Sequence, residues 1–198
     1  MGTITPLVKV AHSYWIKAAA AYTITGCISA TCVGVLLGSF PVVSTVRAYG
    51  LGIVVLFSFL AFVREWAGLK VPLLECRRQT EKMWADEYGF IVASAMWGFH
   101  IGLGFVTYLS NGSFIVLAAI VLTWGRPLDG ALLMLSYWLG RALPVWLLPA
   151  LWPSRDPELL IRNLLASRTM FGKIAGLTCV CLALAIVLDK FGKRLLFK

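Results

Sequence analysis

Charged residues are scarce in this chain. Only 14% of its 198 residues are Asp, Glu, Lys or Arg, whereas a soluble domain has about 25%. With 60% hydrophobic residues, the chain lacks the polar groups to cover its exterior in water. The composition excludes an ordinary soluble protein and predicts an all-α integral membrane protein that is solvated by lipid.

The sequence also lacks the usual signs of catalytic chemistry. None of its five cysteines belongs to a Cys-x-x-Cys pair, and it contains no phosphate loop, metal-ligand cluster or Ser-His-Asp arrangement. Each helical span needs about 20 residues, so spans and loops use up the chain and leave no room for a soluble catalytic domain. We predict no metal site and define no cofactor, and a membrane-embedded enzyme is the least favoured class of function.

Acidic residues are half as numerous as basic ones, 9 against 18, which gives a net charge of +9. In a soluble protein this excess would suggest binding to nucleic acid. Here the lysines and arginines flank apolar segments, where such residues set membrane orientation, so we predict no nucleic-acid partner. The first apolar segment is too long for a signal peptide and lacks an Ala-x-Ala cleavage site, so we expect it to stay as a span.

Long uncharged segments predict one membrane domain over residues 1–198, with six spans. Residues 89–124 contain no Asp, Glu, Lys or Arg, and these 36 residues are too many for one ordinary span. Ser110-Asn111-Gly112 inside them favours a turn, and hence two spans joined by a tight hairpin. The alternative is one helix that breaks within the membrane, giving five spans. The six predicted spans cover approximately residues 15–38, 42–63, 89–108, 113–124, 130–152 and 174–188.

The distribution of basic residues predicts the orientation of the chain. With six spans, twelve lysines and arginines lie on the side of the N-terminus and five on the other, and with five spans the split is eleven to six. Both splits place the N-terminus in the cytoplasm, and the six-span arrangement places both termini there. We expect a protein of a bacterial-type inner membrane, whose partners are the bilayer and other membrane subunits.

A weak internal repeat accompanies these spans. Val35-Leu-Leu-Gly-Ser-Phe-Pro41 resembles Val121-Leu-Thr-Trp-Gly-Arg-Pro127 in hydropathy and in the proline that ends a helix. A glycine-containing span follows each, around Gly50 and Gly140. Paired halves are common in transporters, so a 3+3 pseudo-symmetric bundle is a further expectation.

Two polar side chains in the spans are candidate substrate-binding residues. Arg141 is the one formal charge well inside a predicted span, where a charge costs at least about 2.5 kcal/mol. It is interpreted either as a contact for an anion or substrate, or as a structural residue that satisfies carbonyls freed by Pro144, which has no N–H. His100 is the second candidate, with an inter-helix hydrogen bond as its structural alternative.

Small residues and one cysteine complete the set of candidates. Gly102, Gly104 and Gly140, together with Pro144, are interpreted as helix-packing or gating positions. Gly34-x-x-x-Gly38 is a further close-packing pattern. Cys27 is a candidate redox thiol, and the alternative is that the cysteines are small apolar residues in helix packing.

Two segments carry a resemblance to a known family. Gly98-Phe-His-Ile-Gly-Leu-Gly-Phe-Val-Thr-Tyr108 and Gly130-Ala-Leu-Leu-Met-Leu-Ser-Tyr-Trp-Leu-Gly-Arg-Ala-Leu-Pro144 resemble the second half of the CcdA/DsbD transmembrane family. There, a Gly-Leu-Gly-aromatic run precedes a Pro-Cys, and a later helix carries Gly-x-x-Leu-Pro. The resemblance implies a pseudo-symmetric bundle that passes reducing equivalents through two cysteines. Here Thr107-Tyr108 stand where that family has its second Pro-Cys, and Cys27 follows Gly26 in place of proline.

Two functions therefore lead. The first is a CcdA-like protein that moves a small solute or reducing equivalents across the membrane, and it predicts cysteines facing a shared central cavity. The alternative is a non-catalytic structural or assembly subunit of a larger membrane complex. It predicts a side-facing surface of aromatic or small residues and no cavity.

Overall fold

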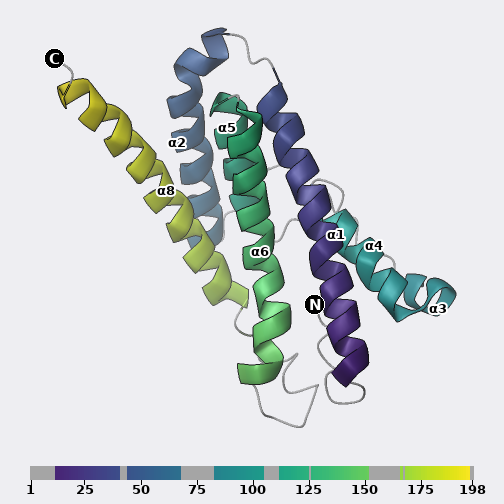
Figure 1. The fold of residues 1–198 in the computed structure, drawn as a ribbon. Coiled ribbons are helices and arrows are strands. Elements are labelled where there is room, and N and C mark those ends of the chain that lie inside the picture. The colour runs from purple at the N-terminus through teal and green to yellow at the C-terminus, as the bar shows by residue number, and fades with distance from the viewer. Residues whose placement is uncertain are drawn as a thin grey trace.

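The regular elements of this computed structural model are helices throughout the residues that it describes, namely 12–40, 44–67, 83–104, 112–124, 126–151, 166 and 168–196. The all-helical fold class is therefore confirmed. The helices are α1 (His12–Ser39), α2 (Ser44–Ala67), α3 (Trp84–Tyr88), α4 (Phe90–Gly102), α5 (Ser113–Trp124), α6 (Pro127–Leu151) and α8 (Arg168–Leu196) (Figure 1).

Four of these helices are long and apolar enough to cross a membrane: α1, α2, α6 and α8. α4 and α5 are equally apolar but have only 13 and 12 residues. They rise about 20 and 18 Å, less than the ~30 Å hydrocarbon core of a bilayer. The helices agree with a polytopic helical membrane protein, whereas the count of six spans and the 3+3 repeat stay predictions.

α1 lies at the centre of one half of the bundle, with α4 on one side of it (Figure 1). The ring of Tyr14 contacts that of Phe90, with 6.5 Å between centroids. Further along both helices, Thr25 Oγ1 donates a hydrogen bond of 2.7 Å to the carbonyl of Ala95. Residue numbers rise together along both helices, so α4 runs parallel to α1.

α6 packs on α1 in the opposite direction. A Cβ atom at Gly34 would overlap the carbonyl of Gly130, and one at Gly38 would come within 2.5 Å of the carbonyl oxygen of Arg126. As numbers rise on α1 they fall on α6, so the two helices are antiparallel. Gly34 and Gly38, which the sequence predicted as close-packing residues, form this contact between α1 and α6. Only glycine lets the two backbones approach this closely.

α2 and α8 form the other half of the bundle and are also antiparallel. A Cβ at Gly172 would lie 2.6 Å from Glu65 Oε2, and one at Gly176 would lie 3.4 Å from the Cα of Phe62. A second hydrophobic cluster joins α2 and α8 to α5 and contains Val54, Ala61, Val116, Ala119, Ile120 and Cys179.

α5 continues in the direction of α4. α4 ends near the middle of α1, because a Cβ at Gly102 would lie 2.7 Å from the carbonyl oxygen of Gly26. α5 ends at Trp124, next to the first residues of α6, and Arg126 lies beside Gly38 at the far end of α1. The two short helices therefore follow one another along α1, each spanning about half of its length.

Candidate functional site at the interruption between α4 and α5

The interruption starts at Gly104. This residue has a φ of +77°, a left-handed conformation that glycine adopts without steric cost. A Cβ at Gly104 would also overlap the ring of Phe114, at the start of α5. α4 ends two residues earlier, at Gly102, and α5 begins after Gly112, whose carbonyl accepts the amide of Ile115 at 3.1 Å. Ser110 and Asn111 of the predicted turn lie outside the described residues.

A series of contacting side chains connects this interruption to Arg141. The buried ring of Phe114 contacts the ring of Tyr137, with 6.0 Å between centroids. The hydroxyl of Tyr137 accepts a hydrogen bond of 3.4 Å from Arg141 Nη1, and the guanidinium carbon lies 5.8 Å from the centroid of the Tyr137 ring. Sequence reasoning missed Tyr137, although a spacing of four residues on a helix was the signal that the two would meet.

Arg141 is half-buried, and few of its N–H donors meet a hydrogen-bond acceptor among the described residues. A guanidinium carries five N–H donors, and the hydrogen bond that the structure gives Arg141 is the long one to Tyr137. Pro144 leaves the carbonyl of Gly140 without its helical donor, but the contact of Arg141 is with Tyr137 and not with that carbonyl. Within the part of the chain that the structure describes, donors of Arg141 are therefore left for another group.

Charges that would compensate Arg141 are missing from the helices around it. α1, α4 and α5 contain no Asp or Glu, and α6 contains only Asp129. Asp129 lies at the other end of α6, beside Arg126, with 3.9 Å between Oδ2 and Nη1. The positive charge of Arg141 is therefore left without an acidic partner on these four helices.

Two tryptophans of α6 hold this helix to α1 on either side of Arg141. Trp138 Nε1 donates to the backbone carbonyl of Thr23 at 2.9 Å, and Trp146 Nε1 donates to Thr23 Oγ1 at 3.0 Å. The Trp138 ring also lies against Tyr22, at 5.0 Å between centroids. Sequence reasoning missed this network. The signal was a tryptophan deep in a predicted span, because a buried indole N–H needs a partner.

His100 is not brought together with Arg141. Its Nδ1 donates to the carbonyl of Met96 at 2.9 Å, within α4, and its ring lies 4.9 Å from that of Trp84 on α3. Gly98 meets α1, and a residue two positions later lies about 200° around the helix. His100 therefore faces away from α1, and its hydrogen bond stays within its own helix.

The cysteines are divided between two parts of the bundle. Cys27 is half-buried on α1 and packs against a first hydrophobic cluster, which joins α1 to α4, α5 and α6 and includes Trp97, Phe114 and Trp138. Cys179 is buried in the second cluster. Cys32 and Cys181 are exposed, and Cys76 lies outside the described residues. Figure 1 shows α1 and α8 on opposite flanks, with α5 and α6 between them. The structure does not bring Cys27 and Cys179 to a shared cavity.

The small-residue candidates differ in their surroundings. Gly102 and Gly104 both lie where a Cβ would overlap a neighbour, Ser29 Oγ in one case and the Phe114 ring in the other. Gly140 is exposed, and a Cβ there would meet nothing within 4 Å. Pro144 is half-buried in α6, which continues past it to Leu151. A gating role for these positions stays a prediction.

Comparison with known proteins gives no relative for this chain: no family model, no curated protein and no solved structure matches it. Among the described residues, no group of three or more His, Cys, Asp or Glu is placed to hold a metal ion.

Proposed function

We propose that the protein transports a small anionic solute across the membrane on a CcdA-like scaffold, with the interruption between α4 and α5 as the solute path and Arg141 as the anion contact. The observation that carries the proposal is the connection from Gly104 through Phe114 and Tyr137 to Arg141. Broken helices near the membrane midplane mark solute sites in many transporters.

The directions of the helices favour the alternative of five spans. In that arrangement α4 and α5 together make one crossing, α6 returns antiparallel to α1, and α8 runs antiparallel to α2. Both antiparallel pairs are observed. With six crossings the fifth span would be parallel to the first, and the sixth parallel to the second. Five crossings put the N-terminus in the cytoplasm and the C-terminus on the opposite face of the inner membrane.

An anion is the solute class that fits this site. The arginine side chain stays protonated at any physiological pH, and the one acid on the four helices around Arg141, Asp129, lies beside Arg126 instead. An anion with two oxygens would accept the paired N–H donors of the guanidinium. Solute transport is favoured over transfer of reducing equivalents, because Cys27 and Cys179 lie in different hydrophobic clusters.

The proposal is tested by the thermal stability of the purified protein with acetate, nitrate, sulfate or phosphate, at constant ionic strength. A ligand at about 100 times its dissociation constant stabilises the folded state by about 2.7 kcal/mol. We expect at least one anion to raise the melting temperature of the wild type but not of Arg141→Gln. The matched control is Arg126→Gln, which removes an exposed arginine from the start of α6. Equal responses of the two variants to every anion would contradict the role of Arg141.

A structural or assembly subunit is the second candidate function. The observation in its favour is an exposed apolar face on α2, where Tyr49 is 70% exposed and Phe59 is 58% exposed. In a mild detergent this function predicts that the protein migrates in a complex much larger than its own 21.7 kDa chain. The double variant Tyr49→Ser with Phe59→Ser would then release it from the complex.

A further inference from the structure

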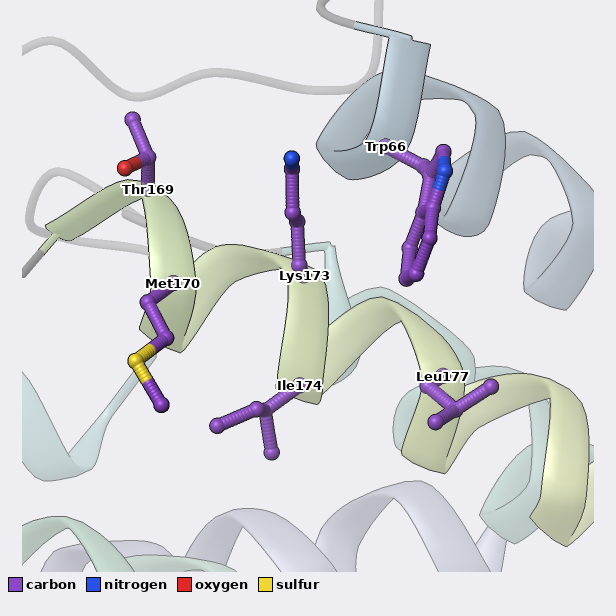
Figure 2. A pocket seen from close by; sticks show the side chains of 6 residues that line it. All are labelled: Trp66, Thr169, Met170, Lys173, Ile174 and Leu177. Carbon is purple, nitrogen blue, oxygen red and sulfur yellow. The ribbon is translucent and has the colours of Figure 1, made fainter.

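A groove lies between the C-terminal end of α2 and the N-terminal end of α8. Its volume is about 380 Å³, and it is lined by Trp66 of α2 and by Thr169, Met170, Lys173, Ile174 and Leu177 of α8 (Figure 2). The Lys173 ammonium lies 5.6 Å from the centroid of the Trp66 ring. Figure 2 shows Lys173 extending on the side of Trp66 and Thr169, with Ile174 pointing the opposite way. The groove thus combines one cation with largely apolar walls.

The groove lies at the level where the uncharged part of both helices ends. On α8, Lys173 is the last charged residue before the 15 uncharged residues from Ile174 to Leu188. On α2, the uncharged stretch from Ala48 to Val63 ends one turn before Trp66. Tryptophan and lysine at such a boundary lie at the depth of the lipid headgroups. The apolar side chains beyond Lys173 lie at the depth of the acyl chains.

The acidic residue near this groove is turned away from it. Glu65 does not line the groove. Its side chain packs against Gly172 and Gly176 between α2 and α8, and its Oε1 is buried without a hydrogen-bond partner. Within the ranges that the structure describes, the groove therefore presents the ammonium of Lys173 without a carboxylate in its lining.

We infer that this groove binds one anionic phospholipid, with the headgroup phosphate on the Lys173 ammonium and Trp66, and an acyl chain along Ile174 and Leu177. The charge of Lys173 complements the phosphate, and the lining residues of α8 on the membrane side of Lys173, namely Ile174 and Leu177, are apolar as an acyl chain is. α2 ends on the side of the membrane on which α1 begins, so this site lies in the leaflet of that side, which we predict to be cytoplasmic. Anionic lipids of the cytoplasmic leaflet attract basic residues. The inference does not depend on the proposed transport function.

The test is native mass spectrometry of the detergent-solubilised full chain after addition of phosphatidylglycerol, phosphatidylcholine or inorganic phosphate. We expect one phosphatidylglycerol to be retained, and phosphatidylcholine to be retained less. A lysine near a membrane surface contributes about 1 kcal/mol to such binding, so Lys173→Gln should lower the retention about fivefold. Trp66→Leu should lower it as well.

The matched control is Lys17→Gln, which removes the same charge from an exposed position near the start of α1. This variant should retain the lipid as the wild type does. Equal loss in Lys17→Gln and Lys173→Gln would overturn the site, because it would show attraction to net charge alone. Equal retention of phosphatidylcholine, or displacement of the lipid by millimolar inorganic phosphate, would overturn its assignment to an anionic phospholipid. Lys173 is exposed, and an unchanged melting temperature in lipid-free detergent would show that Lys173→Gln folds.

Discussion

Gly34 of α1 and Gly130 of α6 lie backbone against backbone, so close that a Cβ on either glycine would overlap the carbonyl of the other. In lipid, helices associate through close van der Waals contact, because no hydrophobic effect drives them together. This pair therefore sets the distance between the two helices that carry Thr23, Trp138 and Arg141.

Gly34→Val should destabilise the protein more than any change on the lipid-facing side of the same helices. Overpacking of a close contact costs about 1–3 kcal/mol, and here the obstacle is backbone that cannot rotate away. The measurement is the melting temperature in detergent. Gly140→Ala is the control, since a Cβ there meets nothing within 4 Å, and it should leave the melting temperature unchanged or slightly raised. A Gly34→Val protein as stable as Gly140→Ala would contradict the packing described.

Gly104→Ala should cost more than Gly89→Ala, although both glycines have a φ of +77°. A residue with a Cβ at a positive φ costs on the order of 1–3 kcal/mol, and both variants bear a cost of this kind, with Gly89 at a ψ of 157°. Only Gly104 adds an overlap with the Phe114 ring, because a Cβ at Gly89 meets nothing within 4 Å. The measurement is the free energy of unfolding of both variants, and the contact with Phe114 is separated from backbone strain by a second change. The additional change Phe114→Leu should recover part of the loss caused by Gly104→Ala, and no recovery would count against that contact.

Trp146→Phe should lose the hydrogen bond to Thr23 Oγ1 while keeping most of the ring contact with Trp15, whose centroid is 5.6 Å away. Hydrogen bonds between membrane helices contribute on average about 0.6 kcal/mol. A double-mutant cycle with Thr23→Val isolates this term, because each single variant removes the same bond. We expect a coupling of about that size. Additive effects of the two changes would show that the bond contributes nothing.

Arg141→Leu should abolish transport while the protein still folds and inserts, if Arg141 contacts the solute. Arg141→Lys keeps the charge but not the paired donors, so it should retain part of the activity. Uptake of the stabilising anion into proteoliposomes, together with expression and melting temperature, separates the two roles. Loss of expression in Arg141→Leu with normal transport by Arg141→Gln would instead indicate a structural arginine.

A reporter at the C-terminus should distinguish five crossings from six. An alkaline phosphatase fused after residue 198 is active only outside the cytoplasm, whereas a green fluorescent protein at the same place fluoresces only inside. We expect phosphatase activity and no fluorescence, as five crossings require. The same reporters joined within residues 152–165 should behave in the opposite way. Fluorescence from the C-terminal fusion would restore the six-span prediction.

Hydropathy located the apolar helices well but could not assign their directions. α5 was predicted over residues 113–124 with the bounds observed, because turn-forming residues lie on both sides of it. α8 starts at residue 168 rather than at the predicted 174, because a helix continues past the membrane boundary, through Lys173. The choice between a hairpin and a broken helix depends on what α4 and α5 contact, and the pattern along the chain does not contain that information.

The candidate site was only partly accessible from the sequence for the same reason. Arg141 was identifiable, because a charge inside a span is costly wherever its partner lies. The packing of α6 on α1 beside Arg141 was not identifiable. Thr23 and Trp146, which hold the two helices together there, are 123 positions apart in the chain and meet only after α1 and α6 pack. His100 was a candidate because it is a polar residue in a predicted span, but its Nδ1 already donates to the carbonyl of Met96, one turn earlier in α4.

The shortness of α4 has a consequence for how the protein is made. A segment of 13 residues that crosses only about two thirds of the bilayer core is a poor substrate for insertion on its own. α1 is synthesised earlier, and its residues Tyr22, Gly26 and Ser29 form the surface that Gly98 and Gly102 require. The first helix therefore acts as a template on which a later, incomplete one is assembled during biogenesis, and damage to that surface of α1 would appear first as a defect in the insertion of α4.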